Sequence, residues 1–227
     1  MGMLMLAVFL PPALMLCRRI ATAPPEKAEQ LYQCGAYGLA LVIYGAMAVQ
    51  ESVLFLSCQL TWDTALPLHL CSLMGALSLP MLLTRHPLLL NGSLFAGVPG
   101  ALLALVFPAV LETRFPRVTE AAFFALHAAL VCAPLLPMAA GWRPRPSGAA
   151  MAFLLLLMAG AAAQLANDLT GSNYLFLAGP VDGTPLMWLS RWGLPVYRLL
   201  LALLAGLVLA AEALVLRCVR RRQCPLC

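Results

Sequence analysis

The sequence predicts an all-α, polytopic bundle of transmembrane helices, and three observations support this fold class. Of the 227 residues, 63% are hydrophobic and only 10% are charged, whereas soluble domains carry about 25% charged residues. The mean hydropathy is +0.91. The apolar residues also gather in runs long enough to cross a bilayer, which takes about 20 residues per helix. An integral, multi-pass membrane protein is therefore expected, in the cell membrane if the source is bacterial.

Seven apolar runs are predicted to span the membrane. Six have full length, and prolines and charged residues mark their ends, as at Arg143-Pro144-Arg145-Pro146. They cover residues 35–57, 66–84, 91–111, 119–140, 149–167 and 195–217.

The remaining run, residues 1–17, is shorter, and the Pro11-Pro12 pair predicts a kink in it. Its positive charges follow the run rather than precede it, which favours a short first helix over a signal peptide. With the six spans at 35–217 and a basic tail at 218–227, residues 1–227 are predicted to form one membrane domain.

The basic residues predict the orientation of the bundle. With seven spans, ten of the 14 basic residues fall on one side of the membrane and four on the other. Cytoplasmic loops carry the excess of Lys and Arg, so the N-terminus is predicted outside and the C-terminus in the cytoplasm. The arginines are dispersed between apolar spans and form no basic face, which argues against nucleic-acid binding. The longest loop, 168–194, carries Trp188 and Trp192, which are typical of a membrane interface.

The C-terminal tail allows several interpretations. Cys224 and Cys227 have the spacing of half a zinc site, but the other half is missing. The last four residues superficially fit a prenylation box with an atypical terminal cysteine. The simplest interpretation of this arginine-rich segment is a basic cytoplasmic anchor.

An octapeptide at the start of the second full-length span places ionisable groups at membrane depth. It reads Leu66-Pro67-Leu68-His69-Leu70-Cys71-Ser72-Leu73. Such groups are rare in membranes and usually face a bundle interior or a cavity, so His69 and Cys71 are candidate functional residues.

The predicted topology brings further polar residues to the same level. Cys71 lies roughly 9 Å and His127 roughly 12 Å from the outer ends of their helices, at about 1.5 Å per residue. The other polar residues predicted in this outer third are Gln50, Glu51, Asn167, Asp168, Asn173 and Tyr174.

Within this group, Cys71 and His127 form the candidate catalytic pair. Residues at i and i+2 of a helix do not face each other, so His127 is a better base for Cys71 than His69. A nearby imidazole can take the thiol proton and generate a thiolate nucleophile. His69 then orients a substrate head group, or bonds Glu51 or another acceptor. The alternatives are that His127 only makes an interhelical hydrogen bond and that Asn167 and Asp168 only cap a helix end.

These segments resemble a known family. The signature of the YwaF-like (TP-type) bacterial integral membrane proteins is similar to Leu66-Pro67-Leu68-His69-Leu70-Cys71. Three other segments follow in the family's order: 97–108, small residues ending in Phe-Pro; 123–130, aromatic residues and then His127; and 167–174, Asn-x-x-x-Gly-x-Asn-Tyr. The resemblance covers about residues 35 to 217.

The family has a vertebrate relative, a multi-pass acyltransferase that remodels ether phospholipids with a cysteine and a histidine. The resemblance implies that Cys71 takes the acyl chain of a phospholipid as a thioester and that His127 is the general base and acid. Asn167 or Asn173 would bind the oxyanion or the head group. The implied partners are phospholipids and lysophospholipids, with no cofactor and no metal.

Three other functions compete with lipid acyl transfer. One is a transporter or channel with an outer vestibule lined by His69, His127, Glu51 and Asp168, although the chain shows no clear internal repeat. Another is a metal or haem site made by His69, Cys71 and His127. The third is a structural or assembly protein in which the octapeptide only packs helices.

Overall fold

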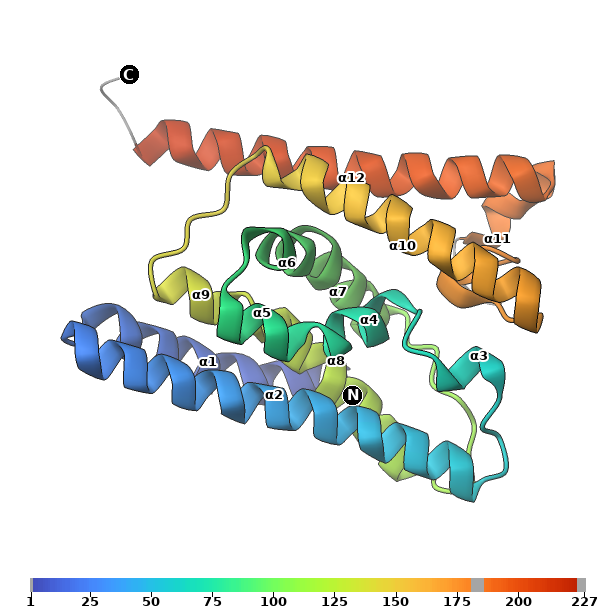
Figure 1. Ribbon diagram of the computed structural model, residues 1–227, viewed down its shortest axis with the longest axis horizontal. Helices are drawn as coiled ribbons and strands as arrows, with labels where there is room; N and C mark the ends of the chain where they lie inside the picture. Colours follow the sequence, from blue (N-terminus) through green and yellow to red (C-terminus); the bar gives the residue numbers. More distant parts are fainter. Residues whose placement is uncertain (1, 181–185, 224–227) are drawn as a thin grey trace.

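The computed structural model describes residues 2–180 and 186–223, and within these ranges every regular element is helical (Figure 1). Six helical segments are long and apolar enough to cross a membrane. They are α1 (Gly2–Thr22), α2 (Pro25–Leu56), α6 to α7 (Pro87–Val106), α8 to α9 (Pro116–Ala139), α10 (Gly148–Thr170) and α12 (Leu194–Gln223). In α12 the candidate membrane span is Leu194–Arg220. The all-α fold is confirmed, and the protein is an integral, multi-pass membrane protein. The number of crossings and their orientation stay predictions.

The first two helices are longer than the sequence suggests. The prediction of a short first helix over 1–17 is wrong, because α1 has 21 residues and continues through Pro11 and Pro12. It packs against α2, α8 and α9. A membrane helix can contain proline when neighbouring helices compensate for the backbone hydrogen bonds that the proline cannot make. α2 begins at Pro25 rather than at residue 35, because proline suits the first position of a helix.

The predicted span at 66–84 is not one long helix. It contains two short helices, α4 (Leu70–Ala76) and α5 (Ser78–Thr84), and is not among the six long segments. It still returns the chain from the C-terminal end of α2 to its N-terminal end, because Arg85 pairs with Glu29 in the second turn of α2.

A proline accounts for the break between α4 and α5. Pro80 has no N–H to donate to the Ala76 carbonyl four residues earlier. The helix changes conformation at Leu77, where ψ is −4°. The hydroxyl of Tyr44 on α2 donates to the freed Ala76 carbonyl at 2.5 Å, so the break leaves no unpaired acceptor there.

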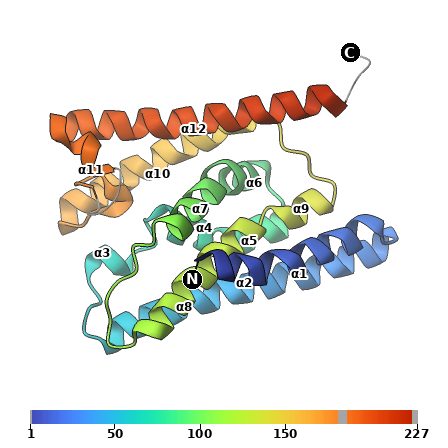
Figure 2. The same cartoon turned by 180° about the vertical axis from the view of Figure 1, so that it is seen from behind.

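The helices lie in three layers (Figures 1 and 2). α10 and α12 form one outer layer, and α1 and α2 form the other, with α8 packed against both of the latter. The helices from α4 to α7 lie between, where α6 and the π-helical turn η1 (Ser93–Gly97) contact α10. The candidate site residues of α4 and α8 are therefore held in the interior of the bundle.

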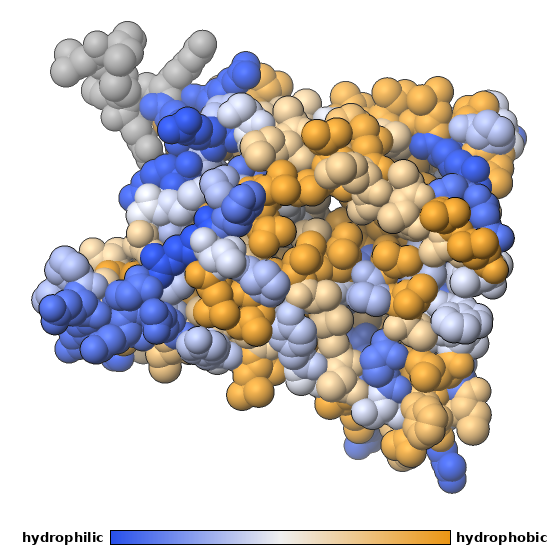
Figure 3. All heavy atoms as spheres, viewed as in Figure 1, coloured by the Kyte–Doolittle hydropathy of each residue, from blue (hydrophilic) through white to orange (hydrophobic). Residues whose placement is uncertain are grey.

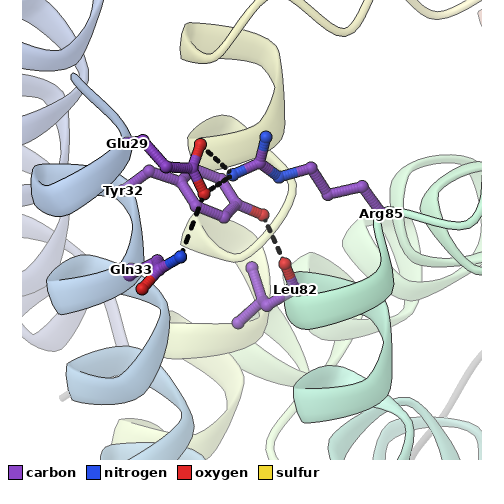
Figure 4. A network of polar contacts seen from close by, with 5 residues as sticks. All are labelled: Glu29, Tyr32, Gln33, Leu82 and Arg85. Carbon is purple, nitrogen blue, oxygen red and sulfur yellow. Dashed lines mark hydrogen bonds and ion pairs between the residues drawn. The ribbon is translucent and has the colours of Figure 1, made fainter. Parts of the chain in front are cut away.

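A polar clamp joins α2 to the end of α5 (Figure 4). Arg85 Nη2 donates to both carboxylate oxygens of Glu29 at 2.6 Å, and its guanidinium lies 3.8 Å from the ring centroid of Tyr32. The Tyr32 hydroxyl donates to the Leu82 carbonyl at 2.6 Å, and Gln33 donates to Glu29 at 3.2 Å. The clamp supplies a partner for a carbonyl in the last turn of α5.

The opposite end of the bundle is closed by the segment between α10 and α12. It contains the 3-10 turns η2 (Tyr174–Phe176) and η3 (Ser190–Trp192), with α11 (Leu186–Leu189) between them. Trp188 and Trp192 are exposed and meet edge to face, with ring centroids 5.1 Å apart. Cys224 and Cys227 of the predicted tail lie outside the described residues.

Candidate functional site

Cys71 lies in the first turn of α4, where it is half-buried and free of any disulfide. It packs against a buried apolar cluster contributed by α2, α7 (Val98–Val106) and α8 (Pro116–Cys132). The cluster consists of Ile43, Ala46, Ala101, Leu126, Ala129 and Leu130. Three of these residues belong to α8, which also carries His127, and α4 contacts α8.

Two glycines let α4 approach α7 closely enough to place the thiol. A Cβ added at Gly100 would lie 2.8 Å from Leu70 Cδ2 and 3.9 Å from Cys71 Sγ, and one added at Gly97 would lie 3.2 Å from Met74 Cγ. Larger residues at these positions would force the side chains of Leu70 and Met74 to shift. The small residues of 97–108 therefore have a structural purpose that the sequence pattern alone does not reveal.

His127 is buried, with 5% of its surface exposed, and its ring is held from one side. The ring centroid lies 4.2 Å from that of Phe123, and Nδ1 lies 2.7 Å from the Phe123 carbonyl oxygen. A carbonyl oxygen only accepts, so the proton of the neutral ring is on Nδ1 and Nε2 keeps its lone pair. Among the described residues, no hydrogen bond joins His127 to Cys71, so a direct proton transfer requires the two groups to move within hydrogen-bond reach of each other.

Tyr174 is the centre of a second polar group, at the end of the bundle. It is fully buried, and its hydroxyl donates to the Trp62 carbonyl and accepts from the Leu66 amide at 3.2 Å. Burial raises the pKa of the Tyr174 hydroxyl, so the group stays protonated and donates. Asn167, at the end of α10, accepts from the Tyr174 amide at 2.7 Å and donates to the Tyr174 carbonyl at 3.1 Å. The two side chains tie the octapeptide to the loop after α10.

Asn173 and Asp63 extend this second group. The Asn173 amide donates to Asp63 Oδ1 at 2.6 Å. The Asn173 side chain accepts from the Ala178 amide at 2.9 Å and donates to the Gly179 carbonyl at 3.0 Å. Sequence reasoning missed Asp63, which belongs to the short helix α3 (Trp62–Ala65) in a polar connection that no apolar pattern marks.

His69 belongs with Tyr174 rather than with Cys71. It is the N-cap residue of α4, and its ring centroid lies 5.2 Å from that of Tyr174 and 5.5 Å from that of Phe176. The Asp63 carboxylate acts on it electrostatically. We call Asp63, His69, Asn167, Asn173 and Tyr174 the loop network.

Two predicted site residues lie apart from both groups. Glu51 is exposed on α2 and acts on Tyr174 only through space. Asp168 is exposed on α10 and accepts from Gln164 at 2.6 Å. The structure thus brings neither carboxylate into a vestibule with His69 and His127. In the described part of the chain, no three His, Cys, Asp or Glu side chains are arranged to hold a metal. His69, Cys71 and His127, the ligand set considered from the sequence, are therefore not gathered into a metal site.

Comparison with known proteins gives one family. A family model described as the TMEM164 family matches residues 1–211, which include both polar groups and all of the long helices except the end of α12. No curated protein and no solved structure matches the chain.

Proposed function

We propose that this chain, which belongs to the TMEM164 family of membrane proteins, is a membrane-embedded phospholipid transacylase with Cys71 as nucleophile and His127 as base. One observation supports the proposal most directly: Cys71 packs against a cluster that includes residues of α8, and α8 carries an imidazole whose Nε2 is unprotonated. The resemblance of 66–71 and 123–130 to the YwaF-like signature points to the same two residues. The substrates proposed are membrane phospholipids and lysophospholipids.

The first half-reaction forms a thioester. His127 Nε2 takes the proton of the Cys71 thiol, and Sγ attacks the carbonyl carbon of a phospholipid ester. The carbon–oxygen bond of the ester breaks as the tetrahedral intermediate collapses. The imidazolium gives its proton to the leaving oxygen, so a lysophospholipid departs and the acyl chain stays on Cys71.

The second half-reaction reverses these roles. A hydroxyl of an acceptor lysophospholipid loses its proton to His127 Nε2 and attacks the thioester carbonyl. The carbon–sulfur bond breaks, and Cys71 recovers the proton. One ester is exchanged for another, so the cycle consumes neither water nor a high-energy donor.

The loop network is assigned a positioning role in this proposal. The side chains of Asn167 and Asn173 each donate to one backbone carbonyl of the loop and accept from one backbone amide. Each keeps a second N–H, but these contacts direct both side chains to the loop, so the proposal uses them for positioning rather than as the oxyanion or head-group donors that the resemblance implies. Their contacts instead hold the segment that leads into α4, which carries Cys71.

The test is detection of an acyl thioester at a single cysteine. The purified protein is incubated with vesicles of phosphatidylcholine, digested, and analysed by mass spectrometry with and without hydroxylamine, which cleaves thioesters. We expect a hydroxylamine-sensitive acyl group on Cys71 that is absent from Cys71→Ser and kept in Cys132→Ser. Cys132 is a matched control because it is a buried thiol on the same helix as His127. Acylation confined to exposed cysteines such as Cys34, or none at all, would overturn the proposal.

A further inference from the structure

A narrow apolar cavity lies on the side of α4 next to Cys71. It has a volume of about 70 Å³, and its walls come from α4, α5, α6, η1 and α10. In Figure 3, hydrophobic residues surround the hollow between α10 and the middle layer. The only polar residue in its lining is Ser93, in the π-helical turn before Pro99.

We propose that this cavity binds an acyl chain of a phospholipid and presents its ester to Cys71, an inference that rests on the proposed transacylase function. The walls are segments of the membrane bundle, so the molecules that reach the cavity from the side are lipids. Apart from one hydroxyl, the lining offers nothing to a charged head group, which would have to lose its hydration there.

The size of the cavity supports the same ligand. Pockets for drug-sized molecules measure about 300–1,000 Å³, and a cavity of about 70 Å³ is much smaller. Four small residues, Gly92, Ala96, Ala152 and Ala159, belong to its lining. A narrow, apolar space of this kind suits a section of hydrocarbon chain.

Leu70 connects the cavity to the thiol. Leu70 lines the cavity. Leu70 Cδ2 and Cys71 Sγ both lie within 4 Å of the position that a Cβ would take if Gly100 were replaced by a larger residue. From Leu70 the lining continues along α4 and α5 to Met81, a path of roughly 16 Å at 1.5 Å per helical residue. A chain in the cavity whose ester lies at Leu70 would have that ester one residue from Cys71 and its methyl end toward Met81.

Photo-crosslinking tests chain binding separately from acyl transfer. The probe is a phosphatidylcholine with a diazirine near the methyl end of one acyl chain, placed in nanodiscs with the full chain carrying Cys71→Ser. We expect cross-links on cavity residues such as Met81 and Leu89, competed by unmodified phosphatidylcholine. Ala159→Leu narrows the cavity and should lower this labelling by about tenfold or more, a difference in binding that is readily measured.

A matched variant controls for folding and for general contact with lipid. Ala162→Leu makes the same change at an exposed position of α10, three residues from Ala159, and should leave the labelling unchanged. Labelling only of exposed helix faces, or equal labelling in both variants, would overturn the cavity proposal. A thioester on Cys71 without cavity labelling would support the transacylase proposal and overturn the proposal that the cavity binds an acyl chain. Cavity labelling without a thioester in the wild type would support acyl-chain binding and overturn the transacylase proposal.

Discussion

The loop network and the Cys71–His127 region each contain a histidine but differ in how their polar atoms are used. In the loop network, Asn167, Asn173 and Tyr174 each pair their side chains with backbone groups of neighbouring segments. Cys71 makes no hydrogen bond to His127 among the described residues, and His127 leaves Nε2 uncommitted. Paired groups hold a structure in place, whereas an uncommitted base on a helix that contacts the helix of the thiol is available for chemistry.

Their surroundings explain this difference. The loop network joins irregular backbone near a helix end, where unpaired amides and carbonyls need partners. Cys71 and His127 instead lie on the helices α4 and α8, and the His127 ring bonds within its own helix, at the Phe123 carbonyl. Mutations in the two regions should therefore affect different properties, namely stability in the first and chemistry in the second.

The largest expected effect is on activity. Cys71→Ser should reduce acyl transfer between phosphatidylcholine and a lysophospholipid by at least about 10³-fold, because an oxygen nucleophile without a strong base replaces the thiolate. Thermal unfolding in detergent should be unchanged, since the two side chains are nearly the same size. A loss of transfer that merely follows a loss of folded protein would place Cys71 among the structural residues.

Asn167→Ala should cause the largest loss of stability. It leaves the buried amide of Tyr174 unpaired, at a cost of about 1–3 kcal/mol, and removes one of two hydrogen bonds to the Tyr174 carbonyl, which still accepts from the Leu177 amide at 3.2 Å. Asp168→Ala is the matched control, because the neighbouring side chain is exposed and bonds only Gln164. Urea or thermal unfolding in a mild detergent measures both. Equal stability of the two variants would show that the loop network does not hold this end of the bundle.

Tyr174→Phe should have a smaller effect of the same kind. The ring keeps its packing against His69, and only the hydroxyl contacts with Trp62 and Leu66 are lost. We expect a loss of about 1–2 kcal/mol, and hydrogen exchange should show faster opening of α3 and the octapeptide. Unchanged exchange in these segments would contradict the assigned contacts.

The smallest expected effect is at the clamp on the other end of the bundle. Glu29→Gln removes the ion pair with Arg85, whose side chains are 48% and 35% exposed, respectively. An exposed pair contributes about 1 kcal/mol or less, and Arg85 keeps its contact with the ring of Tyr32. The difference in unfolding free energy from the wild type should shrink further at high salt. A large loss of unfolding free energy that high salt does not reduce would contradict the assignment of the Glu29–Arg85 pair as an exposed, weakly stabilising ion pair.

Hydropathy predicted the long helices because a bilayer imposes a minimum apolar length, and α10 agrees with its predicted 149–167 almost residue by residue. It failed where helices continue through polar or proline-containing sequence, as at Pro25 and Pro11-Pro12. It also failed at 66–84, where an apolar run hides the break caused by Pro80. Apolar composition reports the surroundings of a segment and not the continuity of its hydrogen bonds.

For the site, the sequence grouped polar residues by their predicted depth in the membrane, but the structure separates these residues into two regions. His69 and Cys71 are two positions apart, yet the first lies against the aromatic rings of the loop and the second against the core cluster. Depth carries no information about the direction a side chain takes, so it also included the exposed Glu51 and Asp168. The tie between Asp63 and Asn173 spans 110 residues of sequence and has no local pattern.

The most direct test of this division compares the two histidines by their effect on one thiol. The rate at which Cys71 is alkylated by iodoacetamide at neutral pH is measured by peptide-resolved mass spectrometry in the wild type, His127→Gln and His69→Gln. The account predicts that His127→Gln slows alkylation of Cys71 by roughly 10²- to 10⁴-fold, the usual contribution of a general base, and that His69→Gln leaves the rate unchanged. Equal rates in all three proteins, or a slower rate in His69→Gln alone, would contradict it.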